Sequence, residues 1–205
     1  FYDLTPSLKA TLTYNTDFAE TEVDQQRVNL TRFPLFYPEK RDFFLEGADL
    51  FSFGGIPKSP LAFHSRKIGL SFNGSKIGIN AGAKLTGRVG PLGIGVLGMG
   101  LDDFENLDSD EVFVGRFTYD LFEESKVGTI FTHGDPQSNL NNQLAGVDLN
   151  LRSSNWWNEQ SVSWHGFYMT SDDENENSDD VIGTHFTFPN YPFRASGHWV
   201  RTGEN

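Results

Sequence analysis

The sequence predicts an all-β protein: an antiparallel up-and-down transmembrane β-barrel, of which about nine or ten strands are visible, with an irregular N-terminal segment. Three observations support this fold class. Gly (21 of 205 residues) and aromatic residues (14%) are abundant, as is typical of β-rich chains. Runs of alternating apolar and polar residues repeat along the chain, and the connections between these runs are alternately short and long.

Nine runs show the alternation of a β-strand, and no run keeps a helical period over more than two turns. A period of two residues places successive side chains on opposite faces of a sheet. The runs are about 8–14 residues long, which suits the roughly 9–11 residues that a tilted membrane strand needs. The predicted strands are Leu61–Ser71, Lys76–Val89, Leu92–Leu101, Glu111–Leu121, Lys126–His133, Gln143–Arg152, Gln160–Thr170, Val181–Phe188 and Phe193–Thr202.

The connections indicate a sheet whose two ends face different surroundings. Short connections lie at Gly90-Pro91, Phe122–Ser125, Ser153–Glu159 and Pro189–Pro192. Longer and very polar connections lie at Asp102–Asp110, Gly134–Asn142 and Ser171–Asp180. Outer-membrane barrels have tight periplasmic turns and longer external loops. No stretch approaches the roughly 18 apolar residues of a membrane helix, which excludes a helical membrane protein and leaves a β-barrel open.

The alternation assigns the strand residues to two faces. We predict an apolar, lipid-facing surface made by Ile77, Ile79, Ala81, Ala83, Leu85, Ala145, Val147, Leu149, Leu151, Val162, Trp164 and Trp199. We predict a watery, lumen-facing surface that carries Lys76, Lys84, Arg88, Arg116, Asp148, Arg152 and Arg194. A soluble antiparallel sheet with one wet face gives the same pattern. Aromatic residues near the strand ends favour the barrel, because interfacial girdles of barrels are aromatic.

The chain divides into residues 1–60, an irregular N-terminal segment, and residues 61–205, the strands of an incomplete barrel. In the first part only Leu8–Tyr14 resembles a strand. This part mixes charges of both signs with many aromatic residues. We predict that it plugs the lumen or constricts its rim through ion pairs; the alternative is a periplasmic or rim loop with local salt bridges. The residues assigned to the plug or rim are Arg32, Glu39, Lys40, Arg41, Asp42 and Glu46.

Three histidines, His165, His185 and His198, fall on the polar parity near the middle of three consecutive strands. With a two-residue turn at Tyr191-Pro192, His198 lies opposite His185; pairing of Thr170 with Asp180 puts His165 opposite His185. Such a row could bind a transition metal or gain charge at acidic pH. The alternative is that the three rings simply fill a polar lumen.

The most specific local sequence is Val28–Gly47 (VNLTRFPLFYPEKRDFFLEG). Together with Leu12–Ala19, His64–Gly69 and Gly82–Gly87, it resembles the characteristic block of a bacterial outer-membrane β-barrel domain family of unknown function. Members of that family are often found C-terminal to a family-nine-type carbohydrate-binding module, which this chain lacks. Lys67 stands where the family pattern has an Arg. The resemblance implies an outer-membrane barrel and implies no reaction.

Charge and composition exclude several function classes. The formal charge is -12, from 16 Lys+Arg and 28 Asp+Glu, which argues against nucleic acid as a partner. The absence of Cys excludes disulfides, thiolate metal sites and cysteine nucleophiles. No nucleophile elbow, HExxH or phosphate-binding loop is present. Paired carboxylates such as Glu39 and Glu46 could suit a glycosidase, but in so acidic a chain such pairs arise by chance. We therefore expect neither catalysis nor a cofactor.

We expect an outer-membrane β-barrel that acts as a passive pore, conduit or membrane anchor in a Gram-negative bacterium. Its partners would be the lipid bilayer, lipopolysaccharide, and a glycan or small solute. The alternative is a soluble β-sheet domain, linked to carbohydrate metabolism, that binds glycans through exposed Trp and Tyr. The two differ in where Ile77, Ile79, Val147, Leu149 and Trp199 point, because a core shared with a second sheet would exclude the barrel. Closed barrels usually have larger, even strand numbers, so we expect further strands after Asn205.

Overall fold

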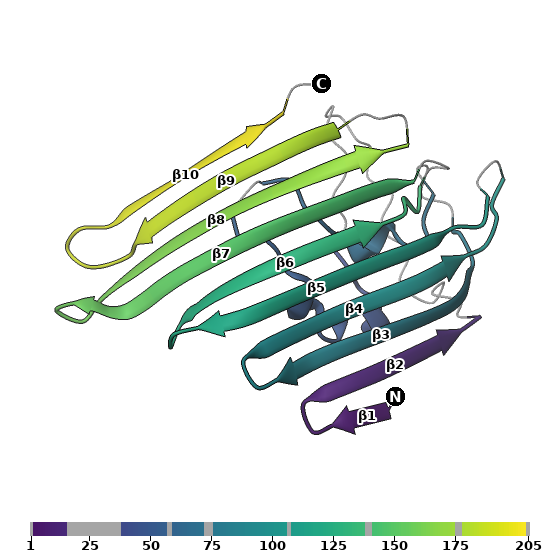
Figure 1. Ribbon diagram of the computed structural model, residues 1–205, viewed down its shortest axis with the longest axis horizontal. Helices are drawn as coiled ribbons and strands as arrows, with labels where there is room; N and C mark the ends of the chain where they lie inside the picture. Colours follow the sequence, from purple (N-terminus) through teal and green to yellow (C-terminus); the bar gives the residue numbers. More distant parts are fainter. Residues whose placement is uncertain are drawn as a thin grey trace.

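The main element of the protein is one ten-stranded antiparallel sheet (Figure 1). The computed structural model describes residues 2–15, 38–56, 59–71, 76–105, 108–137, 141–174 and 178–203. Each strand pairs with its neighbours in chain order, so that β1 and β10 form the two edges and the sheet is not closed into a barrel. The strands are β1 (Tyr2–Thr5), β2 (Leu8–Tyr14), β3 (Ile79–Val89), β4 (Leu92–Leu101), β5 (Glu111–Leu121), β6 (Ser125–His133), β7 (Asn142–Trp157), β8 (Gln160–Asp173), β9 (Ser178–Phe188) and β10 (Ala195–Thr202).

The all-β class and most of the strands are confirmed, and β4 and β5 have the predicted bounds. The strand expected at Leu61–Ser71 is wrong. This stretch contains the 3-10 helix η3 (Ser65–Lys67), and Gly69 has a φ of 76°, which a strand residue does not adopt. The short strand β1 was not expected, and β1 and β2 both belong to the sheet. Residues before position 60 therefore supply two strands as well as irregular structure.

The β7–β8 hairpin is longer than expected. β7 continues to Trp157, and the turn consists of Asn158 and Glu159, both with positive φ (48° and 58°). A two-residue turn with two positive φ angles matches the right-handed twist of the flanking strands. The expected connection at Ser153–Glu159 is therefore mostly strand, and the hairpin projects beyond β3–β6 (Figure 1).

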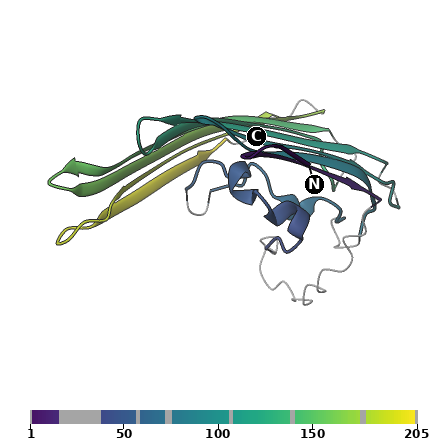
Figure 2. The ribbon, with the colours of Figure 1, turned by 90° about the horizontal axis from the view of Figure 1, so that it is seen from below.

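Residues 38–56 and 59–71, here called the inner segment, lie against one face of the sheet. The sheet curves around them, as Figure 2 shows. The inner segment contains α1 (Asp42–Leu45), η2 (Ala48–Phe51) and η3. No helix in the described residues is long and apolar enough to cross a membrane. We call the covered face of the sheet the inner face and the opposite one the outer face.

The core lies between the inner segment and β3–β5. Its buried residues are Phe44, Phe51, Ile68, Ile77, Ile79, Leu97, Met99, Leu101, Val112 and Val114. A smaller cluster, Ile56, Phe167 and Met169, joins the middle of the inner segment to β8. The inner segment thus spans the inner face, and its apolar side chains bury the middle of that face.

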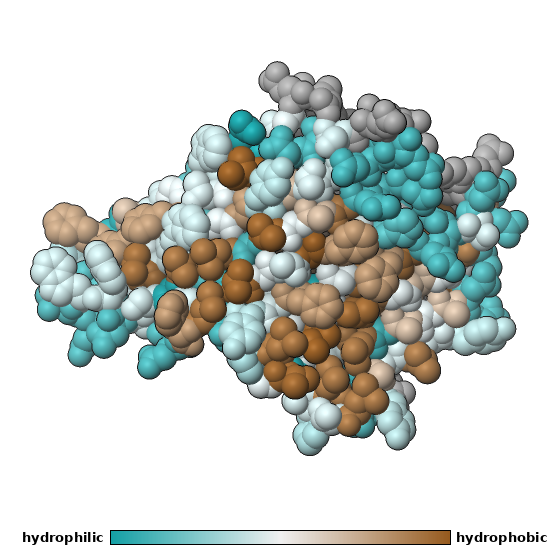
Figure 3. Space-filling view, in the orientation of Figure 1, coloured by the Kyte–Doolittle hydropathy of each residue, from teal (hydrophilic) through white to brown (hydrophobic). Residues whose placement is uncertain are grey.

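The outer face carries the predicted apolar surface with two corrections. Ala81, Leu85, Val147 and the other predicted strand residues lie on it, and Figure 3 shows apolar side chains gathered over its middle. Ile77 and Ile79 were assigned to this surface and are instead buried in the core. An irregularity between Ile79 and Ala81 changes the parity of β3, and a β-bulge moves the residues before it to the other face.

Candidate functional site on the inner face

A buried ion pair, Arg116–Asp148, lies at the centre of the inner face. Arg116 Nη1 and Nη2 donate to Asp148 Oδ1 and Oδ2 at 2.7 and 2.8 Å. The side chains are 2% and 11% exposed. Two backbone groups of the inner segment complete the cluster: Ser52 O accepts from Arg116 Nε at 2.9 Å, and Gly54 N donates to Asp148 Oδ2 at 3.1 Å. The pair therefore ties β5 and β7 to the inner segment.

Arg116 reaches Asp148 across β6 because Gly128 lies between them. A Cβ at Gly128 would lie 2.3 Å from Arg116 Nη1 and 2.7 Å from Asp148 Oδ1. Any side chain there would displace the bidentate pair. Gly146 plays a similar part on β7, because a Cβ there would lie 2.7 Å from the Phe53 ring. The glycines of the inner face thus make room for the ion pair and the inner segment.

A second ionic cluster fixes α1 to β2 and β3. Lys84, 3% exposed, donates from Nζ to Glu46 O at 2.6 Å and also to Phe43 O. Its ammonium lies 4.8 Å from the centroid of the Phe43 ring. Lys9 forms an ion pair with Glu46, and this hydrogen bond from Lys9 lowers the pKa of Glu46. The buried ammonium is therefore satisfied mainly by carbonyl oxygens.

A third cluster lies within the inner segment and joins its two halves. Arg41 donates from Nε and Nη2 to the Glu39 carboxylate at 2.8 Å each. It also donates from Nη1 to Ile68 O and from Nη2 to Ser65 O, both at 2.7 Å. Ser65 Oγ donates to Glu39 at 2.7 Å. Burial alone would raise the pKa of Glu39, but the hydrogen bonds and charge of Arg41, with the Ser65 hydroxyl, outweigh it and lower the pKa to about 2.

Most predicted lumen residues share the inner face, but the inner segment covers three of them. Lys84 and Arg116 are buried under it instead of facing water, and Asp148, 11% exposed, accepts a hydrogen bond from Gly54 of the inner segment. Arg88 pairs with Asp120 at the turn end of the strands, and Arg152 lies 3.4 Å from Glu124. Two residues lie outside the strands of the sheet: Lys76, bridged to Leu70, and Arg194, in the connection before β10.

The residues assigned to the plug or rim fall into three groups. Glu39, Arg41 and Glu46 make the contacts described above. Lys40 and Asp42 are exposed. Arg32 lies outside the described residues.

The histidine row has the predicted register. His198 pairs with His185, and His165 pairs with His185, and the ring centroids are 6.2 and 6.0 Å apart. His185 Nε2 lies 3.2 Å from both Ser196 Oγ and Thr187 Oγ1. Among the residues that the structure describes, no group of three or more His, Cys, Asp or Glu is placed to hold a metal ion. The structure supports the alignment and gives no support to a metal in it.

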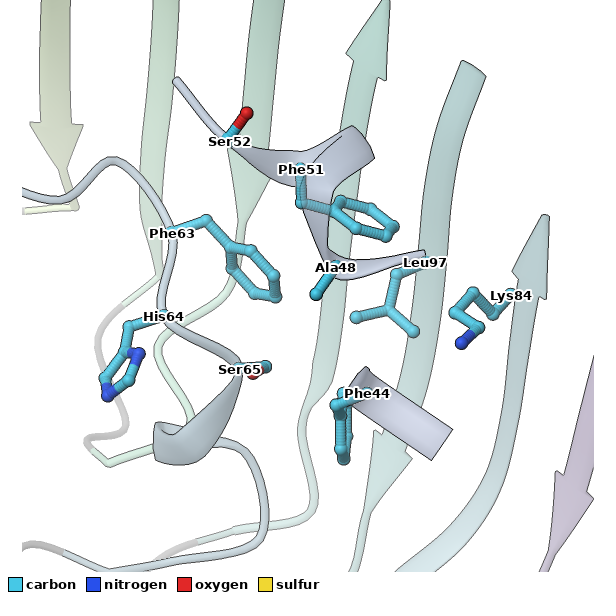
Figure 4. A pocket seen from close by; sticks show the side chains of 9 residues that line it. All are labelled: Phe44, Ala48, Phe51, Ser52, Phe63, His64, Ser65, Lys84 and Leu97. Carbon is cyan, nitrogen blue, oxygen red and sulfur yellow. The ribbon is translucent and has the colours of Figure 1, made fainter. Parts of the chain in front are cut away.

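The sequence patterns did not point to two hollows beside the inner segment. A cavity of about 150 Å³ lies between the inner segment and β3–β4, where Phe51, Phe63 and Leu97 converge (Figure 4). A larger groove of about 470 Å³ lies beside residues 61–68 and shares Phe63 and His64 with the cavity. The many Phe residues between positions 33 and 63 could have indicated an aromatic cluster, but the sequence does not show which of their rings contact one another.

Comparison with known families supplies a match for the N-terminal part. Residues 2–96 match the model of a family described as a domain of unknown function, DUF5916. Over these residues the chain resembles that family. The matched range includes the inner segment, β3 and half of β4, and the ionic clusters of Glu39 and Lys84 lie within it. No curated protein and no solved structure matches the chain.

Proposed function

We propose that this chain forms part of an outer-membrane β-barrel that acts as a passive pore, conduit or membrane anchor, with the inner segment as a plug or constriction of its lumen. The observation that carries the proposal is an inversion of the usual burial pattern. Large apolar side chains of the outer face are exposed, whereas Lys84, Thr86 and Arg116 of the inner face are buried. Exposed apolar surfaces of this extent mark contact with a membrane or another protein.

The distribution of charge on the outer face favours lipid. Along β3–β10 the charged residues of the outer parity are Glu111, Asp172, Asp180 and Arg201. All four lie toward the end of the sheet that carries the long connections. The middle of the face consists of aliphatic, aromatic, Gly, Ser and Thr residues, and a charge near the bilayer midplane would cost about 2–4 kcal/mol.

A membrane barrel also requires hydrogen-bonding partners for the strands at the two edges of the sheet. An open sheet edge cannot face hydrocarbon, because its backbone N–H and C=O groups would lack partners. β1 and β10 are such edges among the described strands. We therefore propose that additional strands pair with both edges in the assembled barrel, and that the long connections face outward in the outer membrane.

The absence of cysteine makes a direct test practical. Single variants Val147→Cys on the outer face and Ser196→Cys on the inner face would carry a nitroxide spin label in the protein reconstituted in proteoliposomes, after replacement of any cysteine outside these 205 residues. Both positions are exposed in the structure. We expect oxygen to relax the label at 147 more strongly, and a water-soluble nickel complex to relax the label at 196 more strongly. Equal nickel access at both positions would contradict the proposal.

A glycan-binding sheet is the second candidate, and one observation favours it. Trp156 and Trp157 are 57% and 70% exposed at the tip of the β7–β8 hairpin. In a barrel these rings would belong to the interfacial aromatic girdle. Full water access at position 147, together with loss of oligosaccharide binding in Trp157→Ala, would favour the glycan function.

A further inference from the structure

We propose that the cavity between the inner segment and β3–β4 binds a small aromatic carboxylate of about the size of benzoate. The cavity lies within the folded chain, so ligand binding there does not depend on whether the sheet enters a membrane. It depends on the size of the cavity, the rings that line it and the charge of Lys84.

The volume and the lining suit one aromatic ring. The cavity measures about 150 Å³, and an engineered apolar cavity of about that volume binds benzene. Phe44, Phe51 and Phe63 supply three rings, and Leu97 supplies its floor from β4 (Figure 4). The Phe51 and Phe63 centroids are 5.7 Å apart and their planes are inclined by 52°, an arrangement within the range of favourable aromatic contacts.

The charge beside the rings suits an anion. Lys84 lines the cavity and is 3% exposed. Its ammonium donates to two carbonyl oxygens, Phe43 O and Glu46 O, which leaves one of its three protons for another acceptor. The nearby Glu46 carboxylate is ion-paired with Lys9. A ligand carboxylate would therefore complete the hydrogen bonds of Lys84 with a charge-assisted bond.

The larger groove supplies an approach to this cavity. Phe63 and His64 line both hollows, and Ile68, Val114 and Leu144 continue the apolar lining of the groove. A ligand that enters through the groove passes the Phe63 ring, which borders both hollows.

The test compares two probes that share a ring and differ in charge, 4-fluorobenzoate and 4-fluorobenzyl alcohol. Each is titrated into the purified full chain in a zwitterionic detergent and followed by fluorine NMR, with detergent alone as the blank. We expect saturable binding of 4-fluorobenzoate, at least tenfold tighter than binding of the alcohol. Absence of saturable 4-fluorobenzoate binding above the blank would overturn the proposal.

Two variants, compared with one control variant, assign the binding to this cavity. Ala48→Phe fills it from η2 and is expected to abolish binding of both probes, whereas Ala145→Phe on the outer face is the matched control and should bind like the wild type. Lys84→Met should bring the affinities for the two probes within about twofold of each other. Unchanged binding by Ala48→Phe, or an unchanged preference in a folded Lys84→Met protein, would overturn the proposal. If circular dichroism shows that Lys84→Met is unfolded, Ala48→Phe alone decides.

Discussion

The two faces of the sheet use the same alternating sequence pattern in opposite ways. On the outer face, Val147 is 51% exposed and Trp199 is 53% exposed. On the inner face, Arg116 is 1% exposed although it is charged. The difference comes from the inner segment, which supplies partners for the buried polar groups. Alternation alone therefore separates the faces of a sheet, and it does not tell which face is covered.

Two ion pairs on the inner face differ in burial, and burial decides how much each contributes to the stability of the fold. Arg116–Asp148 and Arg88–Asp120 both join strands on the inner face, but only the first is buried: the side chains of the second are each 45% exposed. A buried pair is strongly destabilised when one partner is lost, whereas an exposed pair contributes little. Four substitutions, from the largest expected effect to the smallest, test the differences between the two faces and between buried and exposed charges.

The largest loss is expected from Arg116→Met. Because Asp148 would remain buried without its partner, the free energy of unfolding should fall by about 3–5 kcal/mol. Urea unfolding of the purified protein, followed by tryptophan fluorescence, measures the loss. The double variant Arg116→Met/Asp148→Leu should recover part of it; if it is less stable than the single variant, the loss does not come from the unpaired carboxylate.

The next largest effect concerns the outer face. Val147→Arg should impair insertion into lipid, since an Arg facing the bilayer midplane costs about 2–4 kcal/mol, whereas Asn150→Arg on the inner parity of the same strand should be better tolerated. The fraction of protein recovered in proteoliposomes after flotation measures insertion. Equal recovery of the two variants would show that the outer face does not meet lipid.

An intermediate effect is expected from Glu39 and depends on pH. The pKa of Glu39 is lowered to about 2 in the folded protein, so the folded state binds this proton less readily than the unfolded state does. The stabilisation is present above about pH 4.5 and is lost as the pH falls towards 2. The full pKa change corresponds to about 3 kcal/mol, which solvent screening of this partly buried carboxylate reduces to about 2 kcal/mol. The stability difference between wild type and Glu39→Gln, from urea unfolding at several pH values, should therefore shrink over that range. A constant difference would contradict this account.

The smallest effect is expected from Asp120→Asn. The partner Arg88 stays in water when the exposed pair is lost, so the free energy of unfolding should change by less than about 1 kcal/mol. The same urea titration as for Arg116→Met gives the value. A loss as large as that of Arg116→Met would mean that burial does not govern the two pairs.

The sequence alone predicted those strand bounds and strand pairings that depend only on strands adjacent in the chain. Alternation and turn residues predicted β4, β5 and the pairing of His185 with both other histidines. It was insufficient where a single residue changes parity, as between Ile79 and Ala81, because the alternation continues unbroken through the irregularity and nothing in it marks a bulge. The contact of Arg116 with Asp148 was also out of reach. Both residues were assigned to one face, but their pairing depends on the register of three strands and on the glycine between them.

The path of the inner segment has a consequence for the order of folding. The strands pair only with their neighbours in the chain, so hairpins can form one after another as the sheet grows. The inner segment comes between β2 and β3, yet its Ile56 packs against Phe167 of β8. Contacts between residues so distant in the chain carry a larger loop-closure cost and slow folding. We therefore expect the inner segment to complete its contacts with the inner face only after β8 has joined the sheet.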